Sequence, residues 1–403
     1  MFVCLSDDVN NKRNIYLLWK TCFMPPRGFC GSRKCCRTIF LSVLIATLLL
    51  TMLRGLIRAP DFSVCTFIMN ELDMACEEHV TLTDDGYSLF LKRIPSTLEN
   101  APTVILVHGV ADTSATWVVS GRNNSLGGTL HDNGYDVWLV DRRGRAPWAH
   151  DRFTAQDSEF WDFTFDDGIE FDLPAVVEYV HRFTGQDIAS LIGHAEGSLV
   201  NLAALSSNTK LASYVKSTVA FAPPIASWGE TVWKMPHIPD FMDHVVHVGL
   251  VFGSIRITFN GFCDQFPSVC ANAICFLGGC GNPDDLGSDV LSRVFAYYPS
   301  ETSLKTMRHY AQCESHAGLE TFGIDHRPYE FSGLKTPTAM FFGTSDKFVP
   351  AQSAEKARAL FPKGVMEHFE MNLNFGHQDF VWSSRAKTDL YPAVLTFLKS
   401  HQM

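Results

Sequence analysis

Three short segments carry residue types that together could perform acyl transfer. The first is Gly193-His194-Ala195-Glu196-Gly197, the second ends in Asp346, and the third contains His377. Acyl transfer needs an attacking oxygen, a histidine that takes its proton and a carboxylate that orients the histidine. Asp346 can supply the carboxylate and His377 the base, because both follow residue runs typical of strands. Position 195, where a residue with an attacking hydroxyl is expected, is an alanine, Ala195.

The first segment has the spacing of a nucleophile elbow. In the pattern G-x-S-x-G, two glycines permit a sharp strand-to-helix turn that lifts a serine above the sheet. Ala195 holds the serine position here. His108-Gly109-Val110 follows an earlier strand, so the backbone N–H groups of Val110 and Glu196 are the predicted oxyanion donors. The order of elbow, Asp346 and His377 is the order of these groups in α/β-hydrolases.

Apolar runs and helical patterns alternate along most of the chain. Residues 77–94 are predicted to form a hairpin, because alternating strand residues flank an Asp-Asp-Gly turn. Strands are then expected at 103–107, 136–140, 188–192, 217–222, 338–342 and 366–371, and helices near 126–133, 172–184, 196–205, 351–361 and 385–400. This alternation predicts the α/β class, with a mostly parallel sheet flanked by helices.

Residues 225–325 interrupt the alternation. We interpret them as an inserted cap or lid over the carboxyl ends of the strands, where ligands of open α/β sheets bind. The α/β-hydrolase core would then comprise residues 59–224 and 326–403. The cap histidines are expected to be surface or packing residues, since no acidic partner recurs at ligand spacing around them: His237, His244 and His247. No metal site and no cofactor are predicted.

These motifs resemble a known family. The chain is similar to the acid lipases of the gastric and lysosomal type, and is closest in pattern to the plant triacylglycerol lipases among them. The resemblance runs from about Cys65 to the C-terminus. Its carriers are the elbow, Asp85-Gly86-Tyr87, Arg93-Ile94-Pro95, His108-Gly109, Phe160-Trp161, Phe171-Asp172-Leu173-Pro174 and Gly376-His377-Gln378-Asp379-Phe380.

The resemblance implies an α/β-hydrolase with a cap that cleaves triacylglycerols or sterol esters through an acyl-enzyme. Asp346 would orient His377, His377 would be the general base, and Val110 and Glu196 would hold the oxyanion. The expected ligand is therefore a lipid or fatty acyl ester. The chain departs from the family at Ala195, and also at Glu196, where glutamine is usual.

The alanine decides what the site can do. In comparable triads, loss of the serine lowers turnover by about 10⁶-fold. Ser198 lies one helical turn below the elbow, too deep to replace the missing oxygen. Three hypotheses stay open: an ester hydrolase lineage whose serine has been replaced, a lipid-binding pseudo-hydrolase, and a structural or interaction protein. Because Asp346, His377 and Asp379 are retained, we favour an origin as an active enzyme, and predict that the chain as written is inactive or strongly impaired.

The basic charge of the chain is confined to its N-terminal segment. Residues 1–60 carry a net charge of +7, and residues 61–403 a net charge of −17. An acidic body makes nucleic acid an unsuitable partner. Residues 38–58 are predicted to be a transmembrane signal anchor, with residues 1–37 as a basic cytosolic segment. This gives a single-pass type II topology with a lumenal or extracellular body; the alternative is a secreted chain with a long signal peptide.

The cysteines fit that topology. Five lie within the predicted cytosolic segment. The other seven lie beyond the predicted anchor, where an oxidising compartment would allow disulfides. Cys65 and Cys76 are close enough in sequence to bridge. Four more lie in residues 263–280, which allows three pairings and leaves one cysteine over. A zinc site is the competing interpretation, but the short C-x2-C spacing is missing. Asn123 begins a glycosylation sequon that would be usable on the lumenal side.

Overall fold

The computed structural model describes residues 63–226, 263, 266–316 and 318–402. The chain divides into two units, Met1–Ile57 and Arg58–Met403, and all of the described residues belong to the second. The predicted cytosolic segment 1–37, the predicted anchor 38–58 and the three cap histidines lie outside the described residues. Within the described part of the chain, no helix is long and apolar enough to span a bilayer.

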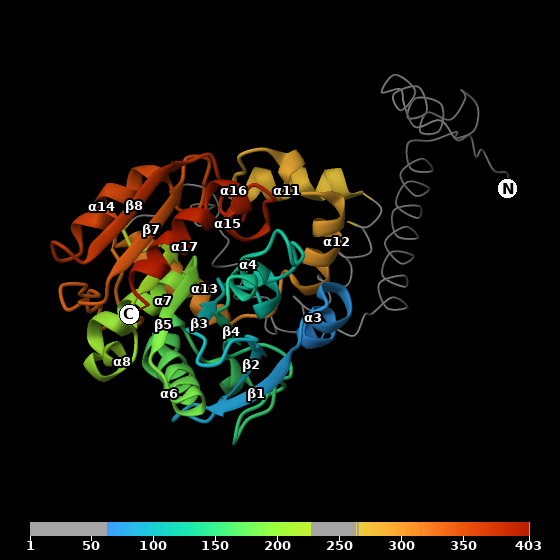
Figure 1. The fold of residues 1–403 in the computed structure, drawn as a ribbon. Helices are drawn as coiled ribbons and strands as arrows, with labels where there is room; N and C mark the ends of the chain where they lie inside the picture. Colours follow the sequence, from blue (N-terminus) through green and yellow to red (C-terminus); the bar gives the residue numbers. More distant parts are fainter. Residues whose placement is uncertain (1–62, 227–262, 264–265, 317, 403) are drawn as a thin grey trace, which may run out of the picture. The chain divides into compact units, whose positions relative to one another are not determined.

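An eight-stranded sheet forms the centre of the second unit (Figure 1), in the order β1-β2-β4-β3-β5-β6-β7-β8. β1 pairs antiparallel with β2 and β2 antiparallel with β4, while the other neighbours are parallel. This confirms the predicted hairpin and the mostly parallel sheet. The bounds are β1 Glu77–Leu82, β2 Ser88–Ile94, β3 Thr103–Val107, β4 Asp136–Asp141, β5 Ile188–His194, β6 Thr218–Phe221, β7 Thr338–Gly343 and β8 Met366–Leu373.

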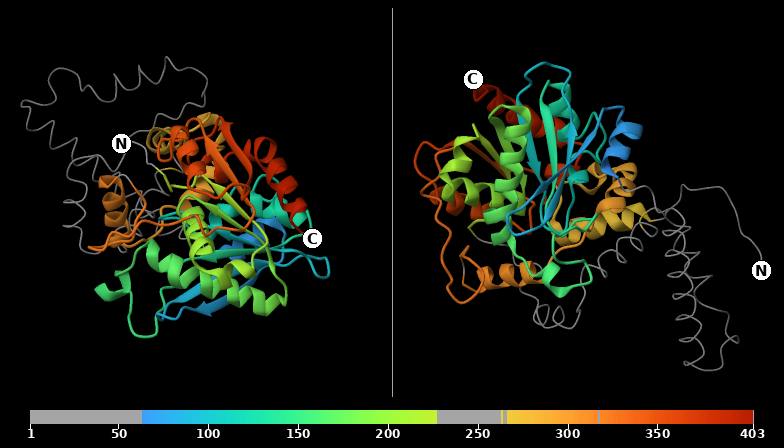
Figure 2. Two further views of the ribbon diagram at one scale, coloured as in Figure 1. Left: turned by 90° about the vertical axis from the view of Figure 1, so that its left-hand side faces the viewer. Right: turned by 90° about the horizontal axis from the view of Figure 1, so that it is seen from below.

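Helices flank the sheet, as Figure 2 shows. β3, β4 and β5 are buried along their whole length, as expected for strands covered on both faces. The helices of the core are α3 Val64–Leu72, α4 Leu126–Asp132, α5 Phe165–Asp167, α6 Leu173–Thr184, α7 Glu196–Ser207, α8 Thr209–Ser213, α14 Ala354–Ala359, α15 Asp379–Trp382, α16 Ala386–Asp389 and α17 Tyr391–Ser400.

Two predicted helices differ in their continuity. The helix expected at 385–400 is divided into α16 and α17, because Pro392 lacks an N–H and is tolerated in the first turn of a helix but not in its interior. The helix expected at 351–361 begins as a 3₁₀ turn, Ala351–Ser353, before α14. α3, which carries Cys65, was not predicted.

The described part of the predicted cap contains three helices: α11 Pro267–Gly278, α12 Ser288–Tyr297 and α13 Leu304–Ser315. α11 packs on α12, and Arg293 of α12 donates a hydrogen bond to Val119 O at 2.6 Å. The disulfides are Cys65–Cys76, Cys263–Cys270 and Cys275–Cys280, so neighbouring cysteines pair in sequence order. Cys313 is the cysteine left over, and it is buried.

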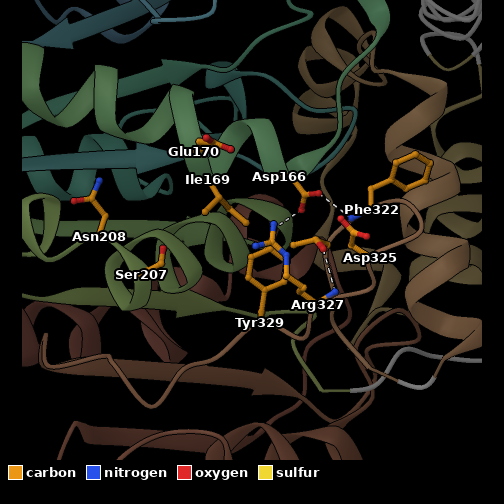
Figure 3. A pocket seen from close by; sticks show the side chains of 10 residues that line it. Asp166, Ile169, Glu170, Ser207, Asn208, Phe322, Asp325, Arg327 and Tyr329 are labelled. Atoms are coloured by element: carbon orange, nitrogen blue, oxygen red, sulfur yellow. Dashed lines mark hydrogen bonds between the residues drawn. The ribbon is translucent and has the colours of Figure 1, made fainter.

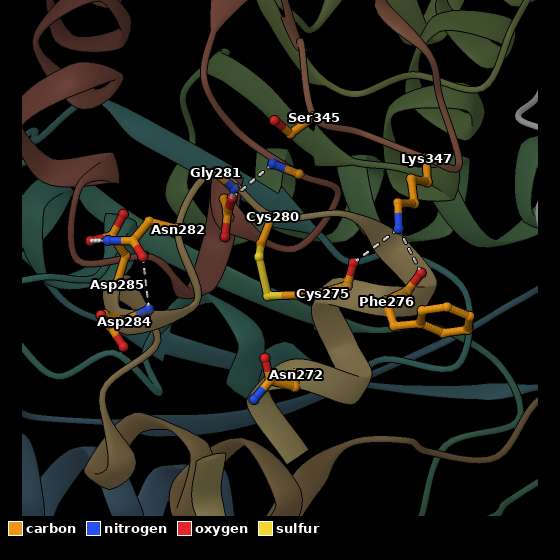
Figure 4. The surroundings of a disulfide bond; sticks show 12 residues. Asn272, Cys275, Phe276, Cys280, Gly281, Asn282, Asp284, Asp285, Ser345 and Lys347 are labelled. Atoms are coloured by element: carbon orange, nitrogen blue, oxygen red, sulfur yellow. Dashed lines mark hydrogen bonds between the residues drawn. A yellow bond between two sulfur atoms is a disulfide. The ribbon is translucent and has the colours of Figure 1, made fainter. Parts of the chain in front are cut away.

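The end of α11 and the turn that follows connect the loops that carry Asp346 and His377. Figure 4 shows this turn, with Lys347 bonded to the carbonyl groups of Cys275 and Phe276. Gly278 O accepts hydrogen bonds from Lys347 N and from His377 N, each at 3.1 Å. A Cβ atom on Gly279 would lie 1.8 Å from Ser345 O, so this close approach requires glycine. The Cys275–Cys280 disulfide closes the same turn. Gly278 and Gly279 therefore help to position both loops.

Asp379 links the His377 loop to the segment that follows α11. Its Oδ2 atom accepts hydrogen bonds from Gly376 N at 2.7 Å and from Gly281 N at 2.6 Å. Desolvation by burial is the largest influence and raises the pKa of Asp379 to about 6, although the two N–H donors oppose the rise. The folded protein thus binds a proton at Asp379 more strongly than the unfolded chain does.

This raised pKa predicts a pH-dependent effect of Asp379→Asn. The stability that Asp379 contributes is present below about pH 4 and is lost as the pH rises through about 6. Asparagine stays neutral, so the free energy of unfolding of the variant, relative to the unsubstituted protein, should increase from pH 4 to pH 7 by up to about 3 kcal/mol. Urea unfolding at the two pH values measures it.

Asp389→Asn is the matched control. Hydrogen bonding to Thr388 is the largest influence and, with Arg385, lowers the pKa of Asp389, so its relative stability should change in the opposite direction over the same pH interval. A stability difference for Asp379→Asn that is equal at pH 4 and pH 7 would contradict the prediction.

Candidate active site

Ala195 occupies a sharp turn between β5 and α7. Its backbone has φ 50° and ψ −119°, a conformation that is unfavourable for a residue with a Cβ atom. A Cβ on Gly193 would lie 2.4 Å from Ser198 N, and a Cβ on Gly197 would lie 2.1 Å from Val107 O. Both flanking positions therefore require glycine. The turn has the geometry of a nucleophile elbow although its central residue carries no hydroxyl.

His377 and Asp346 form a buried hydrogen-bonded pair. Nδ1 of His377 lies 2.9 Å from Oδ2 of Asp346. The other carboxylate oxygen accepts hydrogen bonds from the backbone N–H groups of Phe348 and Val349, each at 2.8 Å. Asp346 is thereby held in place, and its acceptor oxygen directs the Nδ1 proton of His377 toward itself. The Nε2 lone pair of His377 is then available to take a proton.

The residue before Ala195 connects the elbow to the histidine loop. Burial lowers the pKa of His194 to about 3, with a further lowering from His377 nearby, so its ring is neutral. Its Nε2 atom lies 2.8 Å from His377 O and donates a hydrogen bond to it, and the two rings lie 5.0 Å apart between centroids. The structure therefore brings the elbow, His377 and Asp346 together, as the sequence predicted.

The predicted oxyanion donors lie at the ends of β3 and β5. Within the described part of the chain, neither Val110 N nor Glu196 N donates a hydrogen bond. A Cβ atom on Gly109 would lie 3.2 Å from Ala195 Cβ, which places the turn after β3 directly beside the elbow. The predicted donors therefore belong to two segments, the turn after β3 and the start of α7, that lie next to each other at the elbow.

The Glu196 side chain has partners that sequence analysis missed. Its carboxylate is buried, forms an ion pair with Arg142, and accepts a hydrogen bond from Tyr310 Oη at 2.6 Å. An unpaired buried carboxylate would be costly, so Arg142 explains how glutamate is tolerated at this position. The cluster Asp141-Arg142-Arg143-Gly144-Arg145 at the carboxyl end of β4 was the available signal. No sequence signal pointed to Tyr310, which lies on α13.

The Ser198 hydroxyl is engaged elsewhere. Ser198 is fully buried, and its Oγ atom donates a hydrogen bond to Phe221 O of β6 at 3.1 Å. This arrangement agrees with the expectation that Ser198 lies too deep to act in place of a serine at position 195.

Asp112 follows the predicted oxyanion turn. It is buried, and desolvation raises its pKa to about 7, partly offset by a hydrogen bond from Thr113 N at 2.8 Å. Desolvation, followed by the charge of Asp112, also raises the pKa of Tyr298, which is half-buried. The surroundings of the turn are therefore weakly solvated, which strengthens any hydrogen bond to a developing oxyanion.

Two cavities described in the structure lie away from this constellation. One of about 410 Å³ is lined by Asp166, Asn208, Arg327 and Tyr329 among others (Figure 3), and one of about 200 Å³ lies between α11 and α12. Neither Ala195 nor His377 is among the described residues that line these two cavities.

The sequence matches two family models. Residues 65–121 match a partial alpha/beta-hydrolase lipase region, and residues 104–380 match the alpha/beta hydrolase family. Among curated relatives, a gastric triacylglycerol lipase of Bos taurus is 28% identical, over 80% of this chain and 87% of the relative. Lipase member N of Mus musculus is 28% identical, over 81% of this chain and 88% of the relative.

Solved structures support the same fold. A carboxylesterase from Bacillus subtilis has a TM-score of 0.52 at 16% identity, covering 87% of this chain and 99% of its own. A membrane phospholipase A has a TM-score of 0.51 at 15% identity, covering 90% and 99%. The chain therefore belongs to the alpha/beta hydrolase family, and acid lipases of the gastric type are among its homologues.

Proposed function

We propose that this chain is a lipid ester hydrolase by its scaffold, and that it binds its ester but cleaves it slowly or not at all. The observation that carries the proposal is a hydrogen-bonded His377–Asp346 pair beside an elbow whose central residue is Ala195. The substrate class is a triacylglycerol or a sterol ester. Homology to a gastric triacylglycerol lipase supports the first of these.

Each retained group has a role in acyl transfer. Val110 N and Glu196 N would stabilise the oxyanion, His377 Nε2 would accept the proton of the attacking oxygen and later protonate the leaving alcohol, and Asp346 would stabilise the imidazolium. With alanine at position 195, no acyl-enzyme forms. Water next to His377 could attack the ester carbon directly, releasing alcohol and fatty acid in one slow step.

Ala195→Ser is expected to raise ester hydrolysis by several orders of magnitude, toward the roughly 10⁶-fold cost of losing the serine in comparable triads. The elbow already has the required backbone conformation, so the hydroxyl should emerge beside His377. The measurement is the initial rate on a short-chain aryl ester, for the full-length chain and the variant.

Two further variants test the assignment of roles. Ala195→Ser combined with His377→Gln should return the rate to near the background of the unsubstituted chain, whereas Ala195→Ser combined with Ser198→Ala should keep the gain. Rapid turnover by the unsubstituted chain would refute these roles. A folded Ala195→Ser variant without activity would favour the binding or the interaction hypothesis instead.

The binding hypothesis predicts that an intact ester co-purifies with the unsubstituted chain. Solvent extraction followed by mass spectrometry should detect a lipid ester in the unsubstituted protein and free fatty acid in Ala195→Ser, because the variant would hydrolyse what it binds. Ala195→Leu is the matched control, since its larger side chain should occupy the space above the elbow and reduce the bound lipid. An empty extract from the folded, unsubstituted protein would favour a structural or interaction role.

The site is expected to face the lumen or the cell exterior. The three disulfides lie beyond residue 58, and such bonds persist in oxidising compartments. Asn123 of the glycosylation sequon is exposed, as a glycan requires. We retain residues 38–58 as the proposed anchor, which would make the chain a single-pass type II protein, with secretion as the alternative.

A further inference from the structure

Three side chains that can bind metal ions converge outside the active site. They are His316, just after α13, and Glu320 and His326 in the loop that follows. One nitrogen or oxygen atom from each lies within 4.8 Å of the other two. Nδ1 of His316 is 2.5 Å from Glu320 Oε1, and Nδ1 of His326 is 3.2 Å from the same oxygen. Two imidazole rings therefore point at a single carboxylate oxygen.

A glutamine amide borders the three side chains. The Gln312 amide is oriented by the backbone, since its Nε2 donates to Thr321 O at 2.9 Å and its Oε1 accepts from Gly323 N at 3.0 Å. The same Nε2 donates to Glu320 Oε1 at 2.7 Å and lies 3.2 Å from His326 Nδ1.

Both hydrogens of the Gln312 amide are therefore used, and His326 Nδ1–H can donate to the same Glu320 oxygen at 3.2 Å. Without a metal, the three side chains form a His–Glu–His hydrogen-bond network. A bound cation would take the place of the ring hydrogens and accept lone pairs from both Nδ1 atoms and from Oε1.

The surrounding loop already holds the three side chains together. Thr321 N donates a hydrogen bond to Arg327 O at 2.9 Å, and Tyr329 N donates one to Leu319 O at 3.1 Å. Residues 319–321 therefore pair with residues 327–329, and this pairing brings His326 close to Glu320. Glu320 O lies 2.6 Å from Nε2 of the buried His309, which fixes the backbone of the central ligand. Other residues of this loop, among them Phe322 and Arg327, line the cavity of Figure 3.

We propose that His316, Glu320 and His326 form a zinc site. Two imidazole nitrogens and one carboxylate oxygen suit Zn²⁺, whereas Mg²⁺ and Ca²⁺ prefer oxygen ligands throughout. Both histidine side chains are 44% exposed, which leaves water access to a fourth position. The H-x3-E-x5-H spacing has no standard ligand pattern, which explains why the sequence predicted no metal site.

The role of the ion is structural. It ties the C-terminal end of α13 to the loop at 319–329. α13 also carries Tyr310, whose hydroxyl bonds the carboxylate of Glu196 beside the predicted oxyanion hole. The site thus supports a helix that contacts the active site, but its existence does not depend on the function proposed for that site.

Zinc binding to the full-length chain, purified without a histidine tag and treated with EDTA, tests the proposal. Calorimetric titration should give one Zn²⁺ per chain, and Zn²⁺ should raise the Tm while Mg²⁺ does not. Co²⁺ in place of Zn²⁺ should give visible d–d absorption bands. His316→Ala and His326→Ala should each weaken Zn²⁺ binding by at least about 100-fold, since even loss of a group behind the ligands costs 10- to 100-fold.

His401→Ala is the matched control. His401 lies 3.0 Å from Glu367 on the surface, a single histidine–carboxylate pair, and its replacement should leave Zn²⁺ binding unchanged. Equal Tm values of all variants in EDTA would show that each folds. The proposal is overturned if the unsubstituted chain shows no saturable Zn²⁺ binding, or if both ligand variants bind Zn²⁺ as tightly as it does.

Discussion

The sharp turn at residue 195 is the constraint on which the site depends. Glycine is required on both sides of Ala195, because β5, α7 and the end of β3 approach too closely for any side chain there. This crowding forces the unfavourable backbone conformation of Ala195 and directs its Cβ toward the turn at Gly109. The same turn starts α7, whose first N–H groups then face the site. A serine hydroxyl would thus be presented at no further cost in backbone energy.

Around this turn, buried carboxylates need hydrogen-bond or ion-pair partners, because burial removes them from water. Glu196 is acceptable next to the elbow because Arg142 and Tyr310 neutralise and bond its carboxylate. Asp379 joins the His377 loop to the end of α11 at the expense of a raised pKa. The sheet, the segments of α11 and α13, and the His377 loop are consequently linked through a few buried polar groups.

Much of the fold could be predicted because its signals are local. Buried strands are short runs of β-branched and apolar residues, and the elbow glycines are adjacent in sequence. The predictions were wrong where local rules compete, as at Pro392, which divides one helix into α16 and α17. The cysteine pairing stayed open because spacing alone allowed three arrangements in residues 263–280.

The sequence by itself determined which chemical groups are available and in what order they occur, including the absence of a hydroxyl at Ala195. Tertiary structure alone decided which of them meet: Arg142 with Glu196, Gly278 with the loops of Asp346 and His377, and His316 with His326. The physical reason is that such contacts join separate segments whose distance is set by packing and side-chain direction. Periodicity along the chain carries no information about either.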